Sequence, residues 1–272
     1  MEKLKPLTIF VLLSLLSSGC ASTGKIKQLG EVGGVTRETV TAGMSRRVDF
    51  PTDIRFTYLM AWNGVPIGKI IATSYGIKEY RGRDVYVVSV VTESNRFLSK
   101  IYRVEDVYTS YIDTETMTSM RFEADRREGN YRKHLVVEYD FEDMQAIHTN
   151  LTDGSVKKCA IGPEVQDPVS AMCRFMTMSV GPGDNVHMVI TLNEKNYDLY
   201  GRVEDLDVIK LPRLGEFPAF KLVPYAALKG KEVKKGHGWM YFEAGKRKYP
   251  LYGRVWIPFG RVTATLRSVE RI

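Results

Sequence analysis

Alternating apolar and polar residues over most of the chain predict a protein built largely from β-strands. From Ile54 to Trp62 every second side chain is apolar, which is the period of a strand with one buried face. Residues 85–92 are apolar on both faces and indicate a central strand. Short turns rich in Asp, Asn and Gly separate the next segments, as in an antiparallel meander. The expected strands are 54–62, 69–75, 85–92, 102–112, 117–126, 131–139, 145–151, 155–161, 186–192, 197–203, 219–223, 238–244, 249–257 and 261–269.

Residues 165–180 break this alternation and predict an amphipathic helix. Asp167 is a natural N-cap, and Pro168 suits the first helical turn because its φ is fixed and it has no N–H to satisfy. Gly181 begins the sequence that ends the helix. The apolar side of the helix supplies the candidate ligand-binding residues, which are Met172, Phe175, Met176 and Met178. The other interpretation of these side chains is a filled core against a sheet.

Thirteen or fourteen strands are more than a flat open sheet carries comfortably, so the pattern predicts a sheet that curls into a barrel or a large half-barrel. The expected fold class is therefore mostly β: a large curled antiparallel sheet with one helix packed on its concave face. No βαβ rhythm or shift in composition divides residues 49–272, which we expect to form a single domain.

The N-terminus has the pattern of a bacterial lipoprotein signal. Residues 1–19 combine a basic start with an apolar stretch of residues 7–16, too short to span a bilayer. The small residues before Cys20 resemble a lipobox, in which that cysteine is lipidated and becomes the mature N-terminus. Ala21 follows rather than Asp, so the resemblance implies retention in the outer membrane, facing the periplasm. Residues 20–48 are rich in Gly, Ser and Thr and predict a flexible tether from the lipid to the domain.

Cys159 and Cys173 are the remaining cysteines. In an oxidising compartment they could form a disulfide between the strand before the helix and the helix itself. The alternative is two separate buried thiols, and the spacing alone does not choose between them.

Composition narrows the class of protein without defining an activity. The chain has 272 residues, of which 44% are hydrophobic, which is ample for a large core. The formal net charge is +7, from 39 basic and 32 acidic residues interspersed along the strands. Basic clusters flank the strand expected at 238–244 and fall at opposite ends of it. This distribution argues against a nucleic-acid surface and leaves room for anionic lipid headgroups at one end.

No sequence motif specifies catalysis, a metal or a cofactor. Ser155 and Lys158 match the Ser-x-x-Lys pattern of penicillin-binding enzymes, but they follow a turn and enter a strand rather than open a helix. The four histidines are isolated, at positions 134, 148, 187 and 237. The acidic clusters at 140–143 and 204–207 read as solvated turns, since neither has the ligand spacing of a Ca²⁺ loop.

Several structural motifs resemble a bacterial envelope family called domain of unknown function 3108, over roughly residues 52–268. They are Gly64-x-x-x-Gly68, the run from Asp106 to Asp113, the turn Glu128-Gly129-Asn130-Tyr131, the run Gln166-Asp167-Pro168-Val169-Ser170-Ala171, and the closing Pro258-x-Gly260-x-Val262-x-Ala264-x-Leu266. The resemblance implies a fold and no activity. Its curled sheet with an inner helix is similar, by fold-level analogy, to periplasmic carriers of lipoprotein acyl chains.

These observations favour a non-enzymatic outer-membrane lipoprotein that binds a lipid or acyl chain between sheet and helix. One alternative is a structural or assembly protein of the envelope with a protein partner. Another is a hydrolase of the cell wall or of glycan, which would need paired carboxylates in one cleft.

Overall fold

A single antiparallel sheet runs through the whole described part of the protein. The computed structural model describes residues 47–233 and 237–272. Within these residues the sheet has fifteen strands. The strands are β1 (Ile54–Trp62), β2 (Val65–Tyr80), β3 (Arg83–Ser94), β4 (Glu105–Asp113), β5 (Ser119–Glu128), β6 (Tyr131–Asp140), β7 (Gln145–Asn150), β8 (Val156–Ala160), β9 (Asn185–Leu192), β10 (Lys195–Leu211), β11 (Gly215–Leu228), β12 (Lys231–Glu232), β13 (Gly238–Glu243), β14 (Pro250–Ile257) and β15 (Gly260–Arg271). The helices are α1 (Arg96–Ser99) and α2 (Pro168–Thr177).

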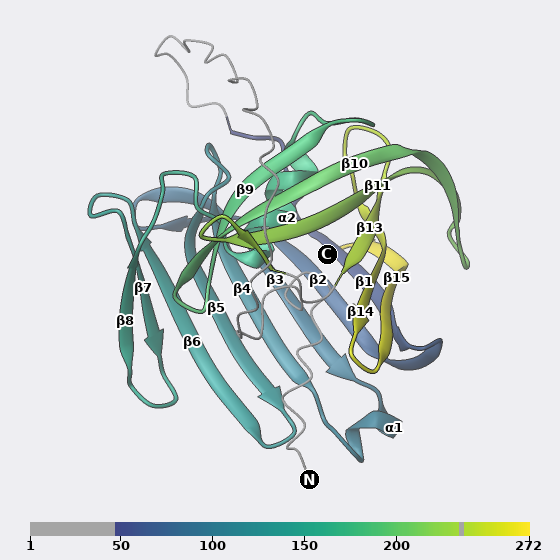
Figure 1. Cartoon of the computed structure of the whole chain (residues 1–272), viewed down its shortest axis with the longest axis horizontal. Coiled ribbons are helices and arrows are strands. Elements are labelled where there is room, and N and C mark those ends of the chain that lie inside the picture. Colours follow the sequence, from purple (N-terminus) through teal and green to yellow (C-terminus); the bar gives the residue numbers. More distant parts are fainter. Residues whose placement is uncertain (1–46, 234–236) are drawn as a thin grey trace.

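The strands follow one another around the sheet in chain order, with one exception at its centre. Strands β1 to β8 form one meander and β9 to β15 another, and the first strand pairs with the last, β1 with β15. The short β12 pairs only with β11 among the described strands. The sheet edges are β8 and β9, and α2 lies on the connection between them. Figure 1 shows the sheet curling around α2, with β9, β10 and β11 crossing above the long strands β2 to β6. The expected mostly β fold is confirmed, and the curled sheet is open because β8 and β9 are its two edges.

A buried hydrogen-bond network fixes the start of α2. Both Val169 N and Ser170 N donate to Asp167 Oδ1, at 2.7 and 2.9 Å, so Asp167 is the N-cap as expected. Its other oxygen, Oδ2, accepts from the hydroxyls of Ser110 on β4 and Ser119 on β5, at 2.5 and 2.7 Å. One side chain therefore caps the helix and ties it to two strands.

Two hydrophobic cores meet at α2. Val169, Cys173 and Met176 pack into the core of β3 to β7, whereas Ala171 and Phe175 pack into the core of β9, β10, β11 and β13. The helix is the element that joins the two meanders on the inside of the curl, because each meander covers a different side of it.

Some predicted boundaries were wrong. The helix ends at Thr177, with Met178 in extended conformation as its cap, and does not reach residue 180. The acidic cluster 204–207 is not a turn: it lies within the 17-residue strand β10, where a bulge interrupts the pairing with β11 between Val203 and Leu206. Helix α1 was not predicted, although Asn95 caps it by accepting a hydrogen bond from Leu98 N.

The residues just before β1 are hydrogen-bonded to the first meander. Val48 N donates to Thr114 O at 2.8 Å, and the Tyr86 hydroxyl donates to Val48 O at 2.5 Å. The predicted signal, Cys20 and nearly all of the tether lie outside the described residues. No helix in the described ranges is long and apolar enough to cross a membrane.

Candidate functional site

A cavity of about 140 Å³ lies between α2 and the concave face of the sheet. Side chains from α2 form one wall, and β1, β2, β3, β14 and β15 supply most of the other. Phe50 and Pro51, just before β1, also contribute to the lining. Almost all of the lining side chains are apolar, so the chemistry of the cavity suits a hydrocarbon group rather than a charged one.

The helix presents two of the four predicted binding residues to this cavity. Met172 and Met176 line it, together with Cys173. Phe175 points the other way and packs against the rings of Phe220 and Phe242, with centroid distances of 6.1 and 4.5 Å. Met178 packs against that same core. The structure therefore places Met172 and Met176 at the site and assigns Phe175 and Met178 to the neighbouring core.

The floor of the cavity comes from residues that were not among the predicted binding residues. Ile70, Ala72 and Val90 face inward on β2 and β3, yet each remains partly exposed because the cavity opens beside it. Ser74 is 4% exposed and lines the same floor. Its Oγ has no hydrogen-bond partner among the described residues. Small residues at inward-facing positions of a strand, Ala72 and Ser74, are the sequence signal that could have indicated the space.

The tyrosines around the cavity have their hydroxyls occupied. Tyr58 donates to Pro250 O at 2.9 Å, and Arg254 Nε donates to the Tyr252 hydroxyl at 3.0 Å. Burial raises the pKa of Tyr58, so this phenol stays neutral over the physiological range. Ser74 carries the one lining hydroxyl in the described residues that makes no hydrogen bond, so it is available to a polar atom of a ligand.

A buried polar cluster lies beyond the cavity on the same face of the sheet. Arg126 forms a salt bridge with Glu128, and Asp106 accepts from the Tyr108 hydroxyl and from Arg127 N. Burial raises the pKa of Glu128 to about 7, and it also raises the pKa of Asp106. Asp106 and Glu128 are 3% and 1% exposed and do not line the cavity. They form a carboxyl pair, but one that is enclosed and out of reach of a polymeric substrate.

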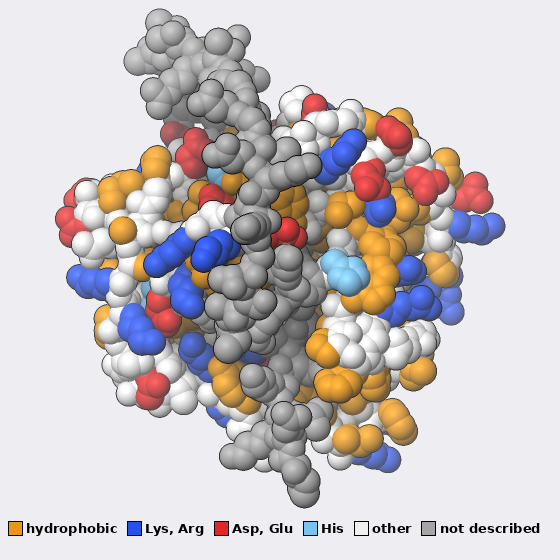
Figure 2. All heavy atoms as spheres, viewed as in Figure 1, with side chains coloured by type: hydrophobic (Ala, Val, Ile, Leu, Met, Phe, Trp, Pro, Cys, Tyr) orange, Lys and Arg blue, Asp and Glu red, His pale blue; other side chains and the backbone are white. Residues whose placement is uncertain are grey.

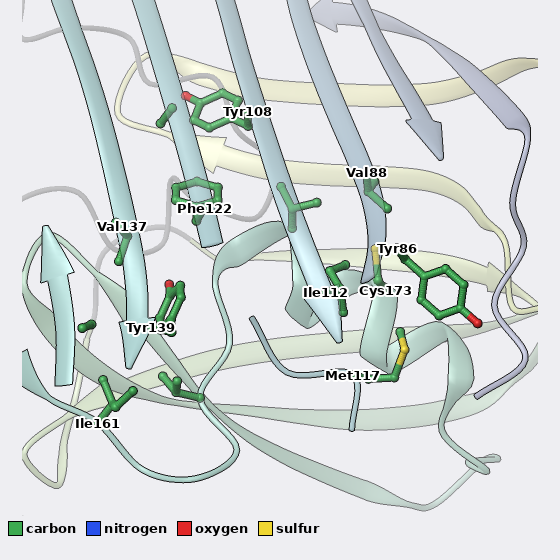
Figure 3. Packing of buried hydrophobic residues seen from close by; sticks show 14 of the residues in the cluster. Tyr86, Val88, Tyr108, Ile112, Met117, Phe122, Val137, Tyr139, Ile161 and Cys173 are labelled. Atoms are coloured by element: carbon green, nitrogen blue, oxygen red, sulfur yellow. The ribbon is translucent and has the colours of Figure 1, made fainter. Parts of the chain in front are cut away.

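Cys159 and Cys173 are free thiols in the structure, and of the two only Cys173 is buried. Cys159 lies on edge strand β8, with its sulfur 3.5 Å from His148 Nε2. Cys173 is buried, and Figure 3 shows it beside Val88 and Tyr86 in the core under α2. Burial raises the pKa of both thiols, so neither is activated as a nucleophile.

The histidines are dispersed over the sheet. His134 contacts Glu123, His187 stacks on Tyr200, and His237 stacks on Trp256, which keeps these three apart. Burial lowers the pKa of His148, which favours its neutral form. In the parts of the chain that the structure describes, no group of three or more His, Cys, Asp or Glu side chains could hold a metal ion.

Comparisons with known proteins include one solved structure that supports this fold, the first described below. A search of curated proteins finds no match. Among solved structures, a β-barrel-like protein of domain of unknown function DUF1849 from Brucella abortus is similar, with a TM-score of 0.57 and 8% identity, covering 82% of this chain and 100% of that one. A protein with a YmcC-like fold from Bacteroides fragilis, assigned as exported, matches with a TM-score of 0.34 and 10% identity over 84% of this chain and 100% of that one. A protein assigned as a lipoprotein from Parabacteroides distasonis matches with a TM-score of 0.36 and 8% identity over 81% and 96%.

The sequence comparison confirms the resemblance drawn from the turn glycines, the strand aromatics and the helix cap. The profile described as "Protein of unknown function (DUF3108)" matches residues 57–267, which is most of the chain. The protein belongs to the DUF3108 family.

Proposed function

We propose that this protein is a non-enzymatic lipoprotein of the outer membrane, anchored through Cys20, that binds the end of an acyl chain or a similar apolar group beneath α2. The observation that carries the proposal is the apolar cavity of about 140 Å³ between the helix and the sheet. Cavities of about 150 Å³ lined by apolar side chains remain dry and accept a benzene ring. The proposed occupant is therefore a group of about six carbon atoms, much smaller than a whole phospholipid.

Two features support binding at this place. Ile70, Ala72 and Val90 are inward-facing but partly exposed, so the cavity communicates with solvent. Met172 and Met176 form the opposite wall, and their unbranched side chains can shift to admit a longer part of a chain. The unpartnered hydroxyl of Ser74 suits a ligand with one polar atom.

Native mass spectrometry of the purified full chain, followed by organic extraction, tests the proposal. We expect a copurifying lipid or fatty acid in the wild type. Ala72→Leu fills the floor of the cavity and should abolish this species. Ala61→Leu makes the same change on β1 at a position facing away from the cavity, so it should leave the ligand in place. Met176→Asp should also abolish binding, because it places an unpaired charge in the apolar wall.

Two results would count against the proposal. One is a wild-type chain free of any ligand, and the other is equal ligand content in Ala72→Leu and Ala61→Leu. Either result would favour an assembly protein with a filled core, for which crosslinking in the envelope should trap one specific partner.

A further inference from the structure

The most exposed hydrophobic side chains gather at one end of the sheet. Ile101, Phe97 and Phe259 are 77%, 71% and 68% exposed, the highest values of any large hydrophobic residue that the structure describes. They lie in the segment that contains α1 and in the turn between β14 and β15. Val65, 58% exposed, lies beside them at the start of β2. We call the three segments 63–66, 95–103 and 258–261 the rim.

Hydrogen bonds join the three segments of the rim into one surface. Asn95 Nδ2 donates to Pro66 O at 2.7 Å, which ties α1 to the turn between β1 and β2. Arg261 N donates to Asn63 Oδ1 at 2.9 Å, and Trp62 Nε1 at the end of β1 donates to Phe259 O at 3.1 Å. These two bonds tie the turn between β1 and β2 to the one between β14 and β15. The exposed side chains are therefore held together by the fold.

A small core directly behind the rim supports it. Leu98 of α1 packs against a cluster that contains Met60, Ile67 and Val262. Leu98 thus fixes the helical turn from which Phe97 and Ile101 project outward. This arrangement fixes the backbone that carries the exposed apolar side chains, so little backbone entropy is lost when they are covered.

All charged residues of the rim are basic. They are Arg96, Lys100, Arg103 and Arg261, and the three segments contain no Asp or Glu. Arg103 is paired with Glu105 of β4, whereas the other three lie on the exposed outside of their segments. In Figure 2, hydrophobic side chains in orange gather at the lower right, where Figure 1 places α1, with Lys or Arg in blue beside them.

We propose that the rim docks onto the surface of an anionic lipid bilayer. Aromatic and aliphatic side chains with basic neighbours are the pattern of segments that lie in the membrane interface, where the apolar groups enter the acyl boundary and the cations meet anionic headgroups. The buried centre of a protein interface is instead depleted of charge. Arg96, Lys100 and Arg261, mixed with the apolar side chains, therefore favour lipid over a protein partner.

Docking of the rim is separate from ligand binding in the cavity, and it predicts an orientation. Residues leading from the anchor enter β1 at Asp53, at the opposite end of the sheet, where Asp53 accepts a hydrogen bond from Gly76 N. A lipid anchor alone would bring that entry end nearest the membrane. If the rim docks, the end of the sheet where β1 ends and β2 begins approaches the bilayer instead.

Quenching of tryptophan fluorescence by brominated lipids can distinguish the two orientations. The full chain is reconstituted into vesicles of phosphatidylcholine and phosphatidylglycerol as Phe97→Trp at the rim, or as Tyr75→Trp at the anchor end. Val65 and Tyr75 are ten residues apart on β2, about 33 Å at the rise of a strand. We expect a blue-shifted emission and strong loss of the added fluorescence for Phe97→Trp, and little loss for Tyr75→Trp.

Charge reversal tests the electrostatic part of the proposal. Arg96→Glu combined with Lys100→Glu should remove most of the quenching in the Phe97→Trp background, and vesicles without phosphatidylglycerol should do the same. Quenching of Phe97→Trp that is no greater than that of Tyr75→Trp would overturn the proposal and leave the rim as a surface for a protein. Quenching that persists after charge reversal would contradict the preference for anionic lipid. Loss of ligand from the cavity would change neither comparison.

Discussion

Replacing Asp167 by Ala should destabilise the protein more than any other change to one of its turns or caps. This carboxylate caps α2 through two backbone N–H groups and also accepts from Ser110 and Ser119, all within the interior. Asp167 itself is fully buried. Removing it therefore releases the helix start and leaves polar groups without partners where water cannot replace them.

The expected loss of unfolding free energy is about 3 kcal/mol. Loss of an N-cap costs about 1 kcal/mol. A buried hydroxyl left without a partner costs about 1–3 kcal/mol, and this applies to Ser110. Ser119 retains Ser170 as a partner at 2.7 Å, so it adds little. Burial raises the pKa of Asp167, and removal of this costly buried acid offsets part of the loss.

Urea unfolding followed by tryptophan fluorescence measures the difference, and a thermal scan should show a fall in Tm of about 6–12 °C for a domain of this size. Asp140→Ala is the matched control. Asp140 also accepts from two backbone N–H groups, at 3.0 Å each, but in an exposed turn. It should cost less than about 1 kcal/mol. Equal losses of unfolding free energy for the two variants would refute the argument that burial and the bonds to the serines make Asp167 contribute more to stability than Asp140.

Three further predictions concern other buried positions. Burial raises the pKa of Glu128 to about 7, so the folded state holds the proton of this carboxyl more tightly than the unfolded state does. The contribution of Glu128 to stability therefore falls as pH rises through 7. Glu128→Gln should flatten the change in Tm between pH 5 and pH 8, and an unchanged slope would contradict this. Phe175→Ala should lower the free energy of unfolding in urea by about 3–5 kcal/mol, because it leaves a cavity in the centre of the core around β9 to β13. A loss below about 1 kcal/mol would show that this core repacks freely. In Gly68→Ala the new Cβ would lie 2.1 Å from Glu93 O, so we expect the free energy of unfolding, measured by chemical denaturation, to fall by about 1–3 kcal/mol. In the control Gly162→Ala the new Cβ meets nothing within 4 Å, and stability should hardly change.

The sequence pattern predicted the elements of the first meander better than those of the second. Strict alternation from Ile54 to Trp62 and the Asp167-Pro168 start of α2 correspond directly to β1 and to the helix. In β10 and β11 the same reasoning failed, because acidic residues at the bulge and Pro218 look like turn residues when taken alone. They are tolerated within strands here because β10 and β11 continue their pairing on both sides of the bulge, a tertiary feature that local propensity does not contain.

The candidate site was only partly predictable for a similar reason. Helical spacing identified Met172 and Met176, but the side of the helix occupied by Phe175 depends on a second core that forms from the later strands. The part that Ala72 and Ser74 play in the floor of the cavity can be recognised only once β2 is placed opposite α2. Periodicity shows which residues face inward, and it does not show what they face.

If the protein is anchored through its N-terminus, as we propose, the pairing of β1 with β15 has a mechanical consequence. Strand β1 is bonded along its length on both sides, through nine residue pairs to β15 and nine to β2. The backbone of Ile272 also donates to Asp53 O, which closes the seam at the point where the chain enters the sheet. A pull applied through the preceding residues would load two ladders together, along the strand axis. An anchor attached at β8 or β9 would instead peel away a single ladder, one bond after another.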